Sequence, residues 1–73
     1  MSYAVEAVLL VRLQANRGEW VSVMSLAEHF SLKLAYVAEL LGGLDERKQC
    51  RVERDSGGQV KRAMAMPKAG GAL

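Results

Sequence analysis

The side chains with the clearest chemical potential in this sequence are the lysines and arginines of its C-terminal third. Residues 47–73 hold seven basic and two acidic side chains, whereas residues 1–46 hold three basic and six acidic ones. Such an asymmetry is typical of a surface that meets phosphate or an acidic protein. The simpler interpretation is a solvated basic tail, together with a strand edge that its charges keep soluble.

The sequence contains few residues that could support metal binding, redox chemistry or nucleophilic catalysis. His29 is the single histidine and Cys50 the single cysteine, and His29 has no cysteine or acid at ligand spacing. We therefore expect no metal site, no disulfide and no cofactor. Cys50 is expected to pack in the core, with a redox-sensing role as the less favoured alternative. Because no glycine-rich phosphate loop, carboxylate pair or nucleophile constellation is present either, we expect no enzyme activity.

The length of 73 residues, with 51% hydrophobic and 25% charged residues, indicates one small globular domain. We expect this domain to span residues 1–66 and residues 67–73 to form a flexible tail. The apolar stretch from Tyr3 to Val11 contains Glu6 and has about half the length of a membrane span. The N-terminus has no signal-peptide pattern. We therefore expect a cytoplasmic protein that makes no membrane contact.

Apolar residues recur at helical spacing in three segments, which predicts helices over residues 3–15, 22–30 and 34–44. The stripes expected to be buried are Val5, Val8, Leu9 and Leu13 in the first helix, Leu26, Ala27 and Phe30 in the second, and Leu34, Val37, Leu41 and Leu44 in the third. The third helix could end at Leu41 or at Leu44. Both ends remain open because Gly42 and Gly43, if they lie inside the helix, each lower its stability by about 1 kcal/mol relative to alanine.

A short strand, Trp20-Val21, is expected before the second helix, for which Ser22 is favoured over Ser25 as the N-terminal cap. From Gln49 the apolar period changes to two, which predicts a β-hairpin. A three-residue loop, Ser56 to Gly58, would place Gly58 in the left-handed conformation.

The register expected for this hairpin pairs Arg54 with Val60, Val52 with Arg62 and Cys50 with Met64. The apolar face that results would consist of Cys50, Val52, Val60, Met64 and Met66. A two-residue loop would scatter these apolar residues over both faces, so the three-residue loop is favoured. Pro67 is expected to end the second strand.

The order helix, short strand, helix, tight turn, helix and hairpin predicts an α+β, mostly α protein with a winged helix-turn-helix fold, made of three helices plus a C-terminal β-hairpin wing. In that fold the third helix enters the major groove of DNA and the wing contacts phosphate. The residues expected to contact DNA are Lys33, Ala35, Tyr36 and Glu39 on the third helix and Arg51, Arg54, Lys61 and Arg62 on the wing.

The first helix is apolar nearly all round, so one small core can cover only part of its surface. We therefore expect a homodimer that buries a second stripe of this helix. The expected dimer interface consists of Tyr3, Ala7, Leu10 and Val11.

Part of this sequence resembles the bacterial winged-helix repressors that include the iron–sulfur-cluster regulator and the cysteine-metabolism repressor. The matching residues are Tyr3-Ala4-Val5, Val21-Ser22, Leu26-Ala27-Glu28, Leu34, Tyr36, Leu40-Leu41 and the wing segment from Val52 to Gly58. The resemblance implies a dimeric transcription factor whose third helix and wing bind DNA. Tyr36 matches the tyrosine of the family, and Arg54 lies near its wing arginine.

The sequence also departs from this family at several positions. Ala35 and Glu39 replace small polar and glutamine residues that meet DNA, and Lys48 replaces the glycine before the wing. The long dimerisation helix of the family and its cluster-binding cysteines have no counterpart among these 73 residues, so no iron–sulfur cofactor is expected.

Two functions remain open from the sequence. The first is a small regulator of transcription, in the manner of a repressor, that binds a specific site in double-stranded DNA. The alternative is a winged-helix protein–protein interaction module that docks an acidic protein partner and does not read DNA sequence. The basic wing favours the first function, whereas Glu39 and the lack of arginine on the third helix favour the second.

Overall fold

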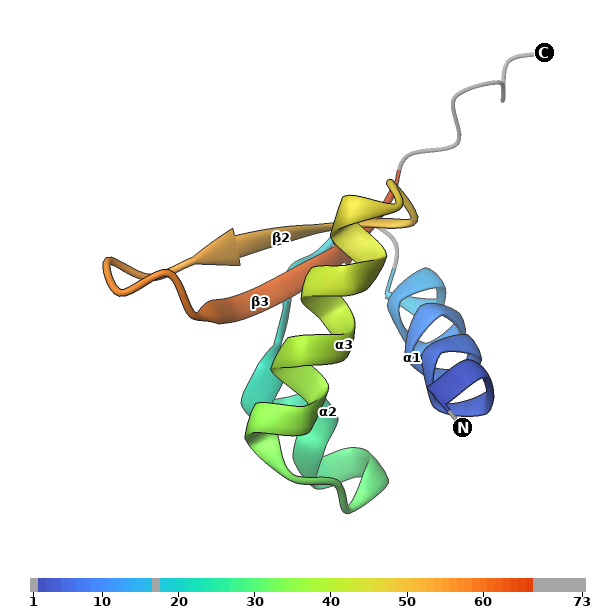
Figure 1. The fold of residues 1–73 in the computed structure, drawn as a ribbon. Coiled ribbons are helices and arrows are strands. Elements are labelled where there is room, and N and C mark those ends of the chain that lie inside the picture. The colour runs from blue at the N-terminus through green and yellow to red at the C-terminus, as the bar shows by residue number, and fades with distance from the viewer. Residues whose placement is uncertain (1, 17, 67–73) are drawn as a thin grey trace, which may run out of the picture.

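The computed structural model describes residues 2–16 and 18–66 of the chain (Figure 1). The elements follow the order α1 (Ser2–Ala15), β1 (Val21–Ser22), α2 (Val23–Phe30), α3 (Leu34–Glu46), β2 (Cys50–Arg54) and β3 (Val60–Ala65). The protein is therefore α+β and mostly helical, as predicted, and its element order is compatible with the winged helix-turn-helix expected from the sequence. The expectations about Pro67 and the tail lie outside the described residues.

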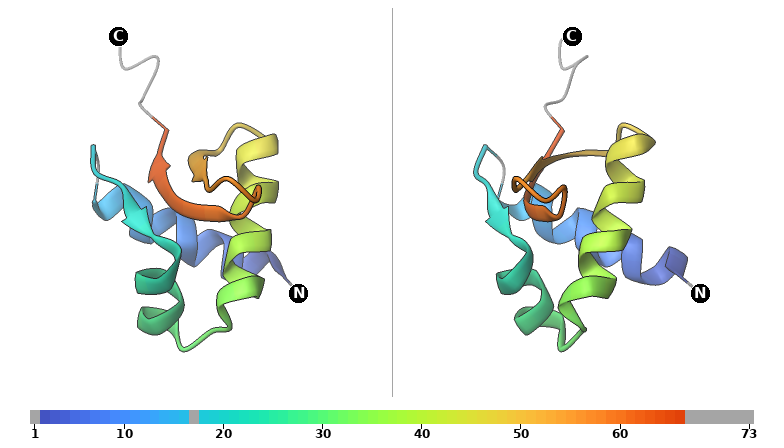
Figure 2. Two further views of the ribbon diagram at one scale, coloured as in Figure 1. Left: turned by 90° about the vertical axis from the view of Figure 1, so that its left-hand side faces the viewer. Right: turned by 60° about the vertical axis from the view of Figure 1, so that its left-hand side comes forward.

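The three strands form one antiparallel sheet in the order β1-β3-β2. β3 is central because the short β1 pairs with it through Val21↔Ala63 and Ser22↔Arg62. The sequence predicted a short strand near this position but gave no partner for it. Figure 1 shows the β2–β3 turn extending away from the helices, while α1 packs at the opposite side of the molecule. Figure 2, in which the turn comes toward the viewer, shows α1 passing behind α3 and the sheet.

Both ends of α2 are fixed by short polar residues. The Ser22 hydroxyl accepts a hydrogen bond of 3.0 Å from the backbone N–H of Ser25, which confirms Ser22 as the cap. Ser31 ends the helix in a left-handed conformation with φ 55°, and its N–H donates to the carbonyl of Glu28. This tight connection leads directly into α3, so the two helices form the helix pair that the sequence predicts.

α3 continues to Glu46, past both of the ends that the sequence left open. Leu44 is completely buried, and this burial offsets the cost of the two glycines before it. A Cβ atom on Gly42 would lie 3.4 Å from the Arg54 guanidinium and 3.9 Å from the Val60 side chain. The glycine therefore lets the hairpin lie close against the helix.

The turn of the hairpin has the predicted three-residue loop. Gly58 has φ 86°, and the Asp55 N–H donates to the Gln59 carbonyl at 2.9 Å. The Asp55 carboxylate accepts hydrogen bonds from the N–H groups of Gly57 and Gln59 and holds the loop together. Arg54 pairs with Val60, as predicted.

Beyond this first pair the predicted register is wrong. An irregularity between Glu53 and Arg54 leaves Lys61 as an extra residue, so Val52 pairs with Ala63 and Cys50 with Ala65, instead of Arg62 and Met64. The predicted register would have placed Arg62 on the same face as Val60, against the helices. Burying the charge of Arg62 there would cost free energy. The bulge avoids this cost because it turns Arg62 outward and Ala63 inward.

The hydrophobic core lies between the three helices and the inner face of the sheet. Its buried residues are Leu9, Leu13, Val23, Leu26, Ala27, Val37, Ala38, Leu40, Leu41, Leu44, Cys50, Val60 and Ala63. Ala65 therefore takes the inward position opposite Cys50 that was expected for Met64, and Ala63 takes the inward position opposite Val52. Met66, which was also expected to face inward, is exposed.

Two apolar residues of the helices that were expected to be buried lie instead at the surface. Val8 is 43% exposed, and Leu10 packs against the core in its place. Because α1 is apolar on both stripes, its sequence could not determine which of them faces inward. Leu34 is 50% exposed because it belongs to the first turn of α3, where it borders an open hollow beside Met24.

Candidate nucleic-acid interface

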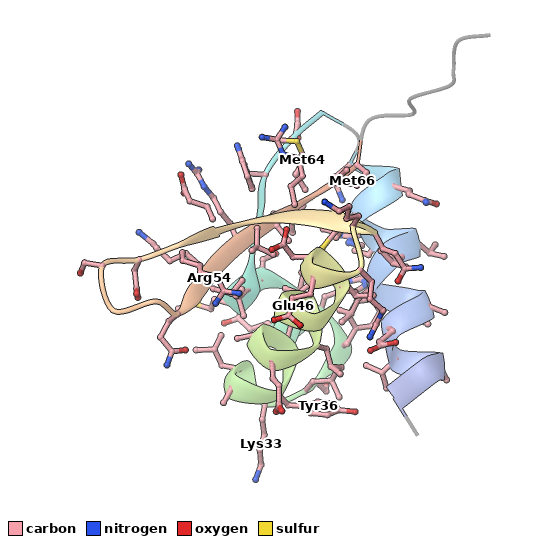
Figure 3. All side chains as sticks on the ribbon, turned by 45° about the horizontal axis from the view of Figure 1, so that its top comes forward. Lys33, Tyr36, Glu46, Arg54, Met64 and Met66 are labelled. Carbon is pink, nitrogen blue, oxygen red and sulfur yellow. The ribbon has the colours of Figure 1, made fainter. Side chains whose placement is uncertain are left out.

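The N-terminal half of α3 presents the four residues that the sequence assigned to groove contact. Lys33 precedes the helix as its N-cap without a capping hydrogen bond from its side chain, and all of Lys33, Ala35, Tyr36 and Glu39 are exposed. Figure 3 shows Lys33 and Tyr36 at the same end of α3. The structure thus brings this part of the predicted site together.

The C-terminal half of α3 has the opposite character. An open hollow of about 630 Å³ over the outer side of this helix is bordered by three carboxylates, those of Glu6, Glu39 and Glu46. Glu6 forms an ion pair of 2.9 Å with Arg47. Because Glu46 is exposed and makes no ion pair among the described residues, it would repel a phosphate at the last turn of the helix, beyond the position of Arg54 at Gly42.

Arg54 is the basic side chain whose guanidinium group reaches from the hairpin to α3. Its Nη1 donates a hydrogen bond of 2.8 Å to the carbonyl of Gly58 in the hairpin turn, while Nη2 lies over Gly42. Figure 3 shows Arg54 between the hairpin and the helix. The guanidinium is thus positioned by both elements, and it borders the same hollow as Tyr36 and Glu39.

Lys61, the extra residue of the bulge, is exposed next to a second hollow of about 500 Å³ between α2, α3 and the hairpin. Met24, Leu34 and Ala35 give this hollow an apolar wall on the helical side. Lys61 therefore lies across the hollow from the N-terminal half of α3, and it belongs to the same surface as the groove candidates.

Arg62 is engaged with neighbours on the other face of the sheet. Its Nε donates a hydrogen bond to the Glu53 carboxylate, and its guanidinium lies 5.0 Å from the centre of the Trp20 ring. The hydrogen bond from Arg62 lowers the pKa of the Glu53 carboxyl below its ordinary value. Contact between Arg62 and phosphate would have to compete with these two partners.

Arg51 also lies apart from α3. It is exposed on β2 and borders a third hollow with Lys48, Cys50 and Met66. The structure therefore groups six of the eight predicted DNA contacts, namely Lys33, Ala35, Tyr36, Glu39, Arg54 and Lys61. It places Arg51 and Arg62 elsewhere.

The apolar part of this surface was not predicted from the sequence. Met24 is 61% exposed and Leu34 is 50% exposed, and both line the hollow beside Lys61. Leu34 follows the helical spacing of the buried stripe, so its sequence position carried no sign of exposure. Met24 lies outside the predicted inner face of α2, and this position was the only sign in the sequence that its side chain would be exposed.

The residues predicted for a dimer interface are split by the structure. Ala7 and Val11 are exposed on the outer side of α1, with Val11 65% exposed, whereas Leu10 packs against the core. Tyr3 belongs to α1, but its side chain lies outside the described part of the structure. Val8, which the sequence placed in the core, joins the exposed stripe instead.

Cys50 is buried where β2 leaves the end of α3. Its thiol is 3.7 Å from the carbonyl oxygen of Leu41, and burial raises the thiol pKa to about 11. A protonated thiol in this position supports the packing interpretation over a reactive thiolate. Over residues 2–16 and 18–66, the structure contains no group of three or more histidine, cysteine or acidic side chains that could hold a metal ion.

Among the helices of the described segments, none has both the length and the apolar character needed to cross a membrane. The resemblance to winged-helix repressors remains a prediction, because it rests on the residues quoted for it alone. The chain gives no match to a family model, to a curated protein or to a solved structure.

Proposed function

We propose that this protein is a winged helix-turn-helix regulator of transcription that binds double-stranded DNA. The observation that carries the proposal is the position of Lys61, which faces the exposed N-terminal half of α3 across an open hollow. A helix with side chains is about 10–12 Å wide and a major groove is about 12 Å wide. α3 would enter the groove by this half, and the hairpin would serve as the wing on the adjacent backbone.

Each of the four candidate residues on this half of α3 has a DNA contact that suits its chemistry. Lys33 reaches a phosphate or the acceptor atoms of guanine, and Tyr36 reads a base by packing its ring on a thymine methyl group. Ala35 packs on a thymine methyl group, and the Glu39 carboxylate accepts from the amino group of cytosine. Arg54 and Lys61 supply backbone charge contacts, which give most of the sequence-independent affinity.

The proposal includes a homodimer that works in the cytoplasm, where it represses transcription at a specific site. One α3 helix spans only a few base pairs, and helix-turn-helix proteins commonly reach a full site by pairing two copies on two half-sites. The resemblance to dimeric winged-helix repressors supports the same arrangement.

A protein-interaction module is the second candidate. The exposed Met24 and Leu34 favour it, because large apolar side chains gathered in a hollow often mark a protein-binding surface. In this alternative the hollow and the basic hairpin would hold an acidic protein partner, and the protein would not read DNA sequence.

A salt titration of binding to random duplex DNA, followed by fluorescence anisotropy, tests the proposal. Contacts from Lys33, Arg54 and Lys61 predict a slope of log affinity against log salt of about −2.7 per protomer. The double variant Lys33→Ala and Lys61→Ala should reduce this slope to about −0.9. Arg51→Ala is the matched control, since it removes an exposed cation from another surface and should leave the slope unchanged.

Two results would contradict the DNA proposal. Wild-type protein that does not bind duplex DNA at low salt would favour the interaction module instead. If the Arg51→Ala control reduced the salt slope as much as the double variant does, DNA would contact the sheet rather than the surface formed by α3 and Lys61.

A further inference from the structure

The outer side of α1 is an uncharged and exposed surface. Val8 is 43% exposed and Val11 is 65% exposed. The exposed residues of this side are Ala4, Ala7, Val8, Val11, Gln14 and Ala15. The charged side chains of α1, Glu6 and Arg12, are partly buried, and Glu6 is bound to Arg47. Figures 1 and 2 show α1 at the side of the molecule away from the hairpin turn, so this surface has no cover within the described chain.

Four of these residues follow the spacing of a coiled-coil seam. The intervals between Ala4, Val8, Val11 and Ala15 are four, three and four residues, which is the alternation of positions a and d in a heptad. We define these four residues as the α1 seam. The seam reads alanine, valine, valine, alanine in both directions along the helix, so it is symmetric about a point between Val8 and Val11.

We propose that the α1 seam binds the α1 seam of a second copy of this chain, with the two helices antiparallel. A twofold axis between Val8 and Val11 would place Val8 of each copy against Val11 of the other, and Ala4 against Ala15. A twofold interface requires such reciprocal contacts. The small alanines at both ends of the seam let the backbones approach closely.

The chemistry of the seam favours a second copy over a different partner. A charged peptide would find no opposite charge on these residues, whereas two identical uncharged stripes meet without repulsion. The symmetric order of large and small residues matches an inverted copy of itself, layer by layer. Binding to a partner with an unrelated sequence would not require a symmetric seam.

The size of the seam predicts how firmly the copies bind. α1 has 14 residues and is therefore about 21 Å long. One helix pair of this length covers less than the roughly 800 Å² per partner of a standard stable interface. We therefore expect a reversible dimer whose population rises with protein concentration.

Sedimentation equilibrium of the full chain, without DNA, tests the proposal over a range of concentrations. Wild-type protein should show a monomer–dimer equilibrium, and Val11→Glu should weaken dimerisation at least tenfold. Met24→Glu is the matched control, because it places the same charge on a residue that is 61% exposed on α2 and should leave dimerisation unchanged. Circular dichroism should show that both variants remain folded.

A mixing experiment tests the antiparallel geometry. Val8→Glu and Val11→Lys should each dimerise poorly alone, whereas a mixture of the two should recover dimers, since position 8 of one copy faces position 11 of the other. In a parallel pair these two charges would not meet, so a mixture without recovery would overturn the antiparallel arrangement.

The interface itself would be refuted by wild-type protein that stays monomeric at every concentration, or by Val11→Glu that dimerises as wild type does. This inference names the surface that joins the homodimer in the proposed function. Its test contains no DNA, so a monomeric protein that still binds DNA, or a dimer that does not, would separate the two proposals.

Discussion

Replacing the interior glycines of α3 by alanine should make the protein more stable. Glycine in a helix interior costs about 1 kcal/mol relative to alanine, because its backbone loses more freedom on folding. At Gly43 the nearest atom to an added Cβ would be the Arg47 guanidinium at 3.9 Å, which is ordinary van der Waals contact. Gly43→Ala should therefore raise the free energy of unfolding by about 1 kcal/mol.

Gly42→Ala should give a smaller gain. Its added Cβ would lie 3.4 Å from Nη2 of Arg54, which is the far end of a flexible side chain. The helix still gains from alanine, but part of that gain, up to about 1 kcal/mol, is offset when the guanidinium moves away. Since Nη1 of Arg54 also holds the Gly58 carbonyl, the same variant should loosen the contact between the helix and the hairpin turn.

Thermal unfolding followed by circular dichroism, at one fixed protein concentration, measures these changes. For a domain of this size, 1 kcal/mol corresponds to a rise in Tm of about 4–8 °C. Gly58→Ala is the contrasting control: its φ of 86° is strained for alanine, so it should lower Tm although no atom lies within 4 Å of the added Cβ. A lower Tm for Gly43→Ala would refute the reasoning, because helix propensity could then not be the dominant effect.

Three further predictions concern single side chains. Ser22→Ala should lower the free energy of unfolding by about 1 kcal/mol in urea titrations, through loss of the α2 cap, and Ser25→Ala should cost less because its hydroxyl has no such role. Burial raises the pKa of the Cys50 thiol from 9.0 to about 11, so its contribution to stability is complete below pH 9 and should be lost as the pH rises toward 11. Urea titrations from pH 8 to 11 should show this loss in wild type and not in Cys50→Ala; identical profiles would contradict it. Tyr36→Ala should weaken a selected DNA site by roughly 1–3 kcal/mol in anisotropy titrations and spare random DNA. An equal loss for both kinds of DNA would exclude sequence reading by this residue.

The helices were predictable because each has apolar residues at a clear helical period. The end of α3 was not, since it depends on a balance between two glycine costs and the burial of Leu44, and burial exists only in the folded chain. α1 shows the same limit in another form. When both stripes of a helix are apolar, periodicity cannot tell that Leu10 packs inward and Val8 outward.

The candidate site was predictable by residue type and only partly by position. Lys33 and Tyr36 were placed correctly at the exposed end of α3, because helix geometry fixes their direction. The role of Arg62 was missed because its neighbours follow from the strand register. Once the bulge shifts that register, Arg62 pairs with Glu53 and covers Trp20 instead of joining the groove candidates.

The bulge at Lys61 also determines which kinds of sequence change the hairpin can accept. Lys61 is exposed, so most substitutions at this position should leave the fold intact. Deleting the residue would also keep both faces of β3, because Val60 and Arg62 would become consecutive, as their partners Arg54 and Glu53 are on β2. Val60 would still face the core and Arg62 would still face outward, and only the local twist that the bulge adds would be lost. The hairpin is therefore tolerant at this position in both composition and length.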